Sequence, residues 1–308
     1  MLGILVIVLI LVLAWFVRAP LPKSNGTLDV AGLRAPVTIR RDDRGIPHIE
    51  ASTVRDLFFG QGFACAQDRL WQMDVLRREA EGNLSELFGP IALSVDEYYR
   101  TIGLGELAQR SADDATPSDR AVLAAYAAGV NAAASTHALP LEFRLLGYRP
   151  APWTPADTMA VALLITKQQD DNWKDELLRS DLAVKVGASA AISLMDVQVA
   201  SLEEYIPGYG PRTAASPRVS HRTGVALEAV AWGRAPGVEP PELADHQGSN
   251  NWSVGASRTT TGKPVLSNDT HLDHTLPSTW WISQLDVVAG AVELRYPPRA
   301  RQRVVEMR

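Results

Sequence analysis

The sequence contains a single cysteine, shows no internal repeat and has no excess of positive charge. One cysteine, Cys65, excludes an intrachain disulfide, so packing must stabilise the fold, and its apolar neighbours favour a buried thiol. The formal net charge is −5 with both signs mixed along the chain, which leaves no basic stripe to gather phosphates and argues against nucleic acid as a partner. Hydrophobic residues make up 46% of the 308 residues, enough for the core of one or two globular domains.

Charged residues are also absent from residues 2–17, an uninterrupted apolar run that ends at Arg18 and Pro20. As a helix this run is just short of a typical membrane span, which needs about 20 residues, with roughly 17 at the lower edge. No Lys or Arg precedes it and no clean small-x-small cleavage site follows it, so a signal peptide and an uncleaved membrane anchor both remain open for residues 1–19. A buried core helix is disfavoured, because such a helix normally has polar positions on one face. We expect export of the remaining chain to the periplasm or the extracellular face.

Two short strands are predicted after the apolar run. Residues 27–51 alternate apolar and polar positions around turns at Gly32 and Asp43–Gly45, which is typical of strands. Helical patterns follow, notably at residues 118–135 and 155–187, so the first half of the chain is predicted to be mainly helical.

The longest predicted helix begins at Ser52 or Thr53, either of which can cap it, and ends before Gly82. Arg77 and Arg78 favour its C-terminal end, where positive side chains oppose the negative end of the helix dipole. One buried stripe is predicted from apolar residues that recur at spacings of three and four. The stripe comprises Phe59, Phe63, Ala66, Leu70, Met73 and Leu76.

Composition changes between Pro207 and Gln247, where Pro, Gly, Ala and Arg predominate. This segment has too few periodic apolar residues to build a core, so we interpret it as a linker or an excisable peptide. It is followed by β structure that is predicted to start close to Ser249. The strand patterns are NWSVGAS, PVLSND and TWWISQLDVVAGAVELRY, with a turn at Thr261–Lys263.

The five residues GSNNW, 248–252, open this β region and place Ser249 near its first position. In one interpretation they are an ordinary turn in which Asn250 and Asn251 make local hydrogen bonds. In the other, Ser249 is a nucleophile, which needs a base to take its hydroxyl proton. The motif is short, and alone it does not decide between the two.

Two bases are available to Ser249. His271, with Asp269 and Asp273 beside it, would make a conventional triad. The α-amine of Ser249 itself would be the base if the bond to Gly248 were cut, because a free α-amine titrates at about pH 8 and lies within one water of the hydroxyl. An excisable segment before the serine and an ordered strand after it are what an N-terminal nucleophile requires.

Four further segments occur in a specific order: RRDDRGIPHIEA, GFACAQDRLWQMDVLRREAEGNLSELFG, SNNW and SNDTHL. By these segments the chain resembles the penicillin acylase family of N-terminal nucleophile hydrolases. They look like the family's early strand motif, its first long helix, the opening of its β chain and the histidine that many acylases place close to the nucleophile. The resemblance implies an α+β fold, the family's four-layer αββα sandwich, here with a helical α chain and only the first strands of the β chain.

The resemblance also implies the roles of the parts of the chain. Residues 20–210 would form the α-chain region, residues 211–248 the spacer peptide and residues 249–308 the start of the β chain. Self-cleavage between Gly248 and Ser249 would make Ser249 the N-terminal nucleophile and the amine base. The α and β chains of the one precursor would then stay together as a heterodimer.

The substrate implied by the resemblance is a linear acyl amide, such as a β-lactam side chain or an N-acyl homoserine lactone. The family's acyl pocket corresponds to a helix that includes residues 163–172. Glu176 would bind one structural calcium ion, for which a carboxylate is a suitable ligand. The alternative is a solvated Glu176 that pairs with Lys174 or Arg179 on a helix.

No organic cofactor is implied. A transition metal held by His271, Asp273 and His274 is disfavoured, because the chemistry of the family needs none. His271 is instead implied to act in catalysis beside Ser249.

One departure from the family is large. Its β chain continues for several hundred residues and supplies the oxyanion-hole donors and the other calcium carboxylates, whereas here residues 249–308 are all that follow. We therefore interpret the sequence as a truncated acylase precursor and expect this chain alone to be inactive. We also expect it to fold poorly, because the stripe from Phe59 to Leu76 would lack strands to pack against. The rival hypothesis is an inactive membrane-anchored fragment that acts only as a binding or structural protein.

Overall fold

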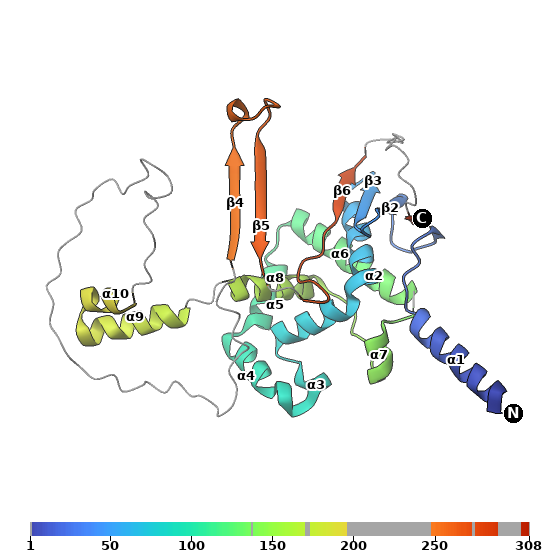
Figure 1. The fold of residues 1–308 in the computed structure, drawn as a ribbon, viewed down its shortest axis with the longest axis horizontal. Helices are drawn as coiled ribbons and strands as arrows, with labels where there is room; N and C mark the ends of the chain where they lie inside the picture. The colour runs from blue at the N-terminus through green and yellow to red at the C-terminus, as the bar shows by residue number, and fades with distance from the viewer. Residues whose placement is uncertain are drawn as a thin grey trace. The chain divides into compact units, whose positions relative to one another are not determined.

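The computed structural model describes residues 2–136, 138–169, 173–195, 248–272, 275–288 and 303–307. These residues form helices and strands together, which confirms the predicted α+β class (Figure 1). The chain divides into two compact units, Met1–Ile165 with Val238–Arg308, and Thr166–Gly237. The segment predicted as a linker, Pro207 to Gln247, lies outside the described residues.

The first unit contains a five-stranded sheet with the order β1-β7-β2-β3-β6. Its strands are β1 (Gly26–Leu28), β2 (Val37–Arg41), β3 (Pro47–Ala51), β6 (Gln284–Val287) and β7 (Arg303–Met307). β2 and β3 are the two strands predicted early in the chain, and they pair antiparallel, while β1 is an additional short strand. β7 lies between β1 and β2, parallel to β1 and antiparallel to β2. Segments far apart in the sequence therefore make one sheet.

α2 (Val54–Glu81) is the long helix predicted from the sequence, and both of its predicted ends are confirmed. At its start, the Thr53 side chain accepts a hydrogen bond from the backbone N–H of Asp56 at 3.1 Å, which satisfies a donor that the helix itself cannot pair. At its end, Gly82 adopts the left-handed conformation with φ 68°. The local sequence signals thus set the length of this helix.

The apolar stripe of α2 packs on β2, β3 and β6. Phe59 and Phe63 are 0% exposed, so the expectation that this stripe would lack strands to pack against was wrong. The reason is that β6 and β7 complete the sheet from the C-terminal part of the chain. Cys65, on the same helix, is buried as predicted, and burial raises the pKa of its thiol to about 11.

α6 (Pro117–Thr136) covers the predicted helical pattern at residues 118–135 and packs closely along α2. A Cβ atom on Gly62 would lie 2.1 Å from the carbonyl oxygen of Tyr126, and a Cβ atom on Gly129 would lie 2.0 Å from that of Phe59. Any side chain at either glycine would therefore push the two helix backbones apart.

Shorter helices complete the first unit. They are α3 (Ser85–Phe88), the 3-10 helix η1 (Gly89–Ala92), α4 (Leu93–Ile102), α5 (Leu104–Asp113), α7 (Leu141–Leu146) and most of α8 (Pro155–Gln169), whose residues from Thr166 onwards belong to the second unit. A smaller apolar cluster joins α2, α4, α5 and α8 through buried side chains such as Ala80, Tyr99 and Leu164. The second unit contains α9 (Trp173–Val186) and α10 (Ala188–Met195), and the pattern predicted at residues 155–187 corresponds to α8 and α9.

The apolar run at the start of the chain forms α1 (Leu2–Arg18). Its side chains from Ile4 to Leu13 are exposed, which disagrees with a buried core helix. In the part of the chain that the structure describes, no helix combines the length and the apolar character needed to cross a membrane.

Candidate active site

Ser249 lies on a two-stranded antiparallel sheet formed by β4 (Gly248–Val254) and β5 (Val265–His271). Both strands were predicted from the sequence, and residues 248–252 are extended rather than a turn. The connection contains the 3-10 helix η2 (Ala256–Arg258) and then Gly262, whose φ of 66° suits the predicted turn. Ser249 is thus the second residue of an ordered hairpin that begins at Gly248.

The register of the hairpin separates its side chains into two faces. Ser249 is opposite Thr270, and Gly248 is opposite His271. Because successive side chains of a strand point to opposite faces, Ser249 and His271 project from opposite faces of the hairpin. The structure brings these two residues to adjacent strands but does not bring the imidazole to the hydroxyl.

His271 shares its face with Asn250 and Asp269. Its Nε2 atom lies 3.0 Å from Asp269 Oδ2 and 3.5 Å from Asn250 Nδ2. The expected histidine–carboxylate pair is therefore present through Asp269, whereas Asp273 lies outside the described residues. Since Ser249 is on the other face, the described part of the hairpin does not form a conventional Ser-His-Asp triad.

The metal predictions concern Glu176 for calcium, and His271, Asp273 and His274 for a transition metal. Glu176 is exposed on α9, in the second unit, and one carboxylate supplies only one of the roughly six to eight ligand groups that Ca²⁺ requires. Within the described ranges, no group of three His, Cys, Asp or Glu side chains is placed to hold a metal ion. For the transition-metal alternative, Asp273 and His274 lie outside the described residues. Calcium binding by Glu176 stays a prediction.

The predicted acyl-pocket segment, residues 163–172, is only partly described. Residues 163–169 belong to α8, where Leu164 is 0% exposed and packs in the smaller apolar cluster. Residues 170–172 lie outside the described part of the chain. Leu164 therefore contributes to the core of the first unit, and a pocket role for this segment stays a prediction.

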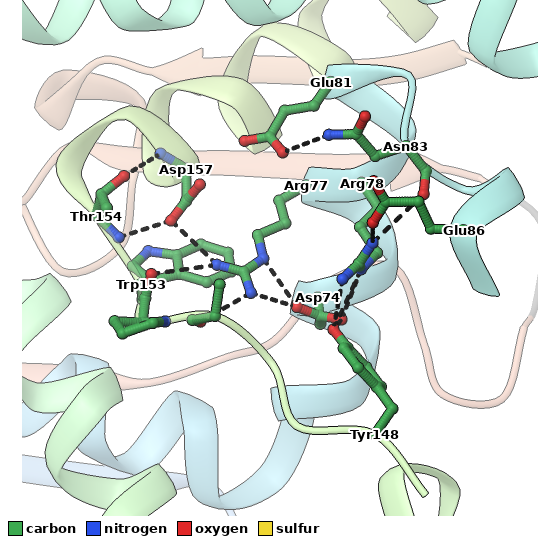
Figure 2. Close-up of polar contacts among 12 residues, drawn as sticks. Asp74, Arg77, Arg78, Glu81, Asn83, Glu86, Tyr148, Trp153, Thr154 and Asp157 are labelled. Atoms are coloured by element: carbon green, nitrogen blue, oxygen red, sulfur yellow. Dashed lines mark hydrogen bonds and ion pairs between the residues drawn. The ribbon is translucent and has the colours of Figure 1, made fainter. Parts of the chain in front are cut away.

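A buried ion-pair network on the last turns of α2 was not predicted from the sequence (Figure 2). Arg77, 4% exposed, donates from Nε to Asp74 Oδ1 at 2.8 Å and from Nη1 to Asp157 Oδ2 at 3.1 Å. Its Nη2 atom also donates to the Ala151 carbonyl at 2.9 Å. Arg77 was expected to favour the helix end through the dipole, but its guanidinium instead joins α2 to α8. The i,i+3 spacing of Asp74 and Arg77 was the available signal.

Two carboxyl groups meet at the edge of this network. Glu81 accepts a hydrogen bond from Asn83 Nδ2 at 3.3 Å, and its carboxyl points towards Asp157 (Figure 2). Burial, together with the hydrogen bond and the negative charge of Asp157, raises the pKa of Glu81 to about 7. Asp157 already accepts from Arg77 and from the Thr154 backbone N–H at 2.6 Å. Glu81 is therefore the partner that holds the proton.

A cavity of about 280 Å³ lies beside Arg77, between α2, α6 and residues 149–153. The amide of Asn131, which lines it, donates to the Trp153 carbonyl at 2.8 Å and accepts from the Trp153 backbone N–H at 2.7 Å. Arg77 and Asp74 are also paired within the protein. These polar groups hold elements together, and we assign the network a structural role.

Comparisons with known proteins agree on one relationship. A family model described as penicillin amidase matches residues 36–297. The chain is 33% identical over 272 residues to acyl-homoserine lactone acylase QuiP of Pseudomonas aeruginosa. The aligned region covers 84% of this chain and 30% of that protein. The chain is also 36% identical over 265 residues to the penicillin acylase 2 proenzyme of a Pseudomonas species. This aligned region covers 85% of this chain and 34% of that protein.

Among solved structures, thermostable penicillin G acylase from Alcaligenes faecalis matches with a TM-score of 0.43 and 24% identity, over 61% of this chain and 98% of that chain. The chain spans about a third of the length of the curated relatives described above.

Proposed function

Because the chain belongs to the penicillin amidase family, we propose that it carries the nucleophile of an acylase that hydrolyses linear acyl amides. The observation that supports this role for Ser249 is its place at the start of β4, directly after Gly248 and the segment interpreted from its composition as a linker or an excisable peptide. Ser249 is exposed there, so a cut between the two residues would leave a free amine on an ordered strand. The family's four-layer αββα sandwich is part of the same proposal.

The register favours the α-amine of Ser249 over His271 as the base. The amine lies within one water of its own hydroxyl by covalent geometry, while the imidazole projects from the opposite face. In the proposed reaction, the hydroxyl oxygen attacks the amide carbonyl and its proton passes to the amine. The proton then goes to the leaving amine as the acyl–serine ester forms, and water hydrolyses that ester to release the acid.

His271 is proposed to act by position rather than by taking the serine proton. Its contact with Asn250 links it to the residue that follows Ser249 in the chain. The contact with Asp269 fixes the imidazole orientation. Together these contacts would set the conformation of the first residues of β4, and hence the direction of the nucleophile.

The substrate class, assembly and location are proposed from the relatives. Their names specify acyl-homoserine lactones and penicillin, so we propose an N-acyl homoserine lactone or the side-chain amide of a β-lactam as substrate. We propose that residues 20–210 form the α chain, residues 211–248 the spacer and Ser249 the first residue of the β chain, in a processed heterodimer. Export, with residues 2–17 as signal or anchor, and one calcium ion at Glu176 complete the proposal.

Oxyanion donors usually contribute the largest electrostatic term in acyl transfer. None of the described residues is assigned to that role, and the chain spans about a third of its relatives. We therefore propose that activity belongs to a longer form of the protein and that residues 1–308 alone do not turn over. The second candidate is a membrane-anchored binding or structural fragment without activity, and the exposed apolar side chains of α1 are the observation that favours it.

Sequencing and mass measurement of the longer form test the proposed processing. Wild-type protein should yield a chain that begins Ser-Asn-Asn-Trp, and Ser249→Ala should abolish both this cleavage and amide hydrolysis. Ser253→Ala is the matched control, because Ser253 is also exposed on β4, and it should cleave normally. A new N-terminus at any other residue, or cleavage that survives Ser249→Ala, would refute the proposal. An intact, inactive wild-type chain would support the binding fragment.

A further inference from the structure

α7 presents two apolar side chains to solvent beside the end of α1. Leu145 is 70% exposed and Leu146 is 49% exposed. The preceding Phe143 is 1% exposed and anchors α7 in the main core. The orientation of the two leucines is therefore fixed by the packing of α7.

Arg144 joins this exposed turn to the apolar helix α1. Its guanidinium lies 3.9 Å from the ring centroid of Phe16 and 5.2 Å from that of Trp15. It also donates a hydrogen bond to the Phe16 carbonyl, one of the carbonyls that a helix end leaves unpaired. The last turn of α1 is thus held against α7, the helix that carries the two exposed leucines.

We infer that Leu145 and Leu146 of α7, together with α1, form one binding surface for an anionic lipid bilayer; this rests on the anchor alternative of the proposed function, in which residues 2–17 are retained. The two helices carry the side chains that interfacial binding requires: exposed apolar residues, aromatic residues where α1 meets α7, and basic residues close by in the sequence. In Figure 1, α1 and α7 both extend from the body of the first unit rather than packing under its sheet.

Charge complementarity identifies the occupant. Residues 1–28 contain no Asp or Glu, while Arg18 and Lys23 follow the apolar run. Around α7, residues 138–150 contain two basic residues, Arg144 and Arg149, and one acidic residue, Glu142. A basic border of this kind is attracted to anionic headgroups, and the attraction weakens as salt screens it. A second copy of the chain would bring the same positive charges together.

Flotation with phospholipid vesicles tests the surface without any need for catalytic turnover. The full chain should float with vesicles that contain phosphatidylglycerol and should float less with phosphatidylcholine alone or at high salt. Replacing both leucines, Leu145→Asp with Leu146→Asp, should lower the bound fraction by roughly tenfold or more, since it removes apolar insertion and adds two negative charges. The matched control is Ile91→Asp with Leu93→Asp, at positions that are 86% and 50% exposed on η1 and α4, and it should bind as wild type.

A dye placed on α7 separates insertion of α7 from insertion of α1 alone. Cys65 is the only cysteine and is buried, so Leu145→Cys can be labelled selectively with an environment-sensitive fluorophore. Vesicles should shift its emission to the blue, and a label at Ile91→Cys should not shift.

Three outcomes would overturn the inference. The full chain could fail to float with anionic vesicles, or the label at position 145 could stay in an aqueous environment while the chain floats. The same label could also shift in the absence of vesicles as the chain self-associates, which would assign the surface to a second copy.

Discussion

At the scale of single residues, Arg77 shows how a buried charge connects elements. It is shared by Asp74 on α2 and Asp157 on α8. Removing one partner of such a pair leaves an uncompensated buried charge and typically costs about 3–5 kcal/mol, although the pair itself contributes little net stability. The function of Arg77 is therefore to fix the position of α8 on α2, with Glu81 completing the contact as a protonated acid.

The protonation of Glu81 predicts a pH dependence of stability. Its pKa is about 7 in the folded protein and about 4.3 in an unfolded chain, so the folded state binds the proton more tightly. The contribution of this proton to the free energy of unfolding is fully present below about pH 4.3 and is lost as the pH rises through about 7. Because Glu81 is only half-buried, solvent screening limits the loss to about 1–2 kcal/mol.

Glu81→Gln should remove this loss, since the amide keeps a donor towards Asp157 and carries no charge. The variant should be more stable than wild type at pH 8 and similar to it at pH 5, as measured by urea unfolding at both values. Glu97→Gln, which neutralises an exposed carboxylate on α4, is the control. Equal stabilisation by Glu81→Gln at both pH values would contradict the shared proton.

At the scale of elements, the contact between α2 and α6 depends on two glycines that leave room for backbone. Gly62 and Gly129 each sit against a carbonyl of the facing helix. This arrangement allows the two helices to pack more closely than side chains at these positions would permit. The position of α6 therefore also determines how α2 is buried.

Gly129→Ala should destabilise the first unit by several kcal/mol, because its methyl group would meet the Phe59 carbonyl at 2.0 Å. That penalty should exceed the gain of at most about 1 kcal/mol in helix propensity. Thermal unfolding followed by circular dichroism measures the difference. Gly255→Ala is the matched control, because Gly255 has φ −62° and no heavy atom lies within 4 Å of the place its methyl group would take, and it should change stability little. A stabilised Gly129→Ala protein would show that the helices do not pack so closely.

The elements that were predicted from the sequence are those with local signals. The cap at Thr53, the stop at Gly82 and the stripe of α2 were all found, as were the strands on either side of Gly262. The buried ion pairs were missed because Asp157 reaches Arg77 only after α8 has packed. The sequence also could not predict that the side chains of Ser249 and His271 project from opposite faces of the hairpin, because the register of the two strands alone decides this.

At the scale of the whole molecule, the five-stranded sheet joins the two ends of the described chain. β7 pairs with β1 and with β2, so Val305 lies opposite both Gly26 and Ile39. This pairing supplies the strands that the sequence was expected to lack beneath α2. Local patterns could not reveal it, because the pairing depends on a long-range contact.

Met307→Ala tests the contribution of β7 to the core. Met307 is 0% exposed and lies near Gly60 of α2, so truncation should cost about 2–5 kcal/mol. Urea unfolding of the purified chain measures the loss. Leu266→Ala, at a position that is 79% exposed on β5, should change stability little. Equal effects of the two substitutions would show that β7 does not lie inside the sheet, between β1 and β2.

The place of β7 also has a consequence during translation. The ribosome adds about 5–20 residues per second, and 261 residues, 42–302, lie between the end of β2 and the start of β7. The nascent β2 therefore waits roughly 13–50 s for its neighbour to be synthesised. Throughout that interval its edge can pair with nascent chains on the same polysome. Slow codons between β3 and β6 would lengthen this interval, and a chaperone that binds the early hairpin would protect it.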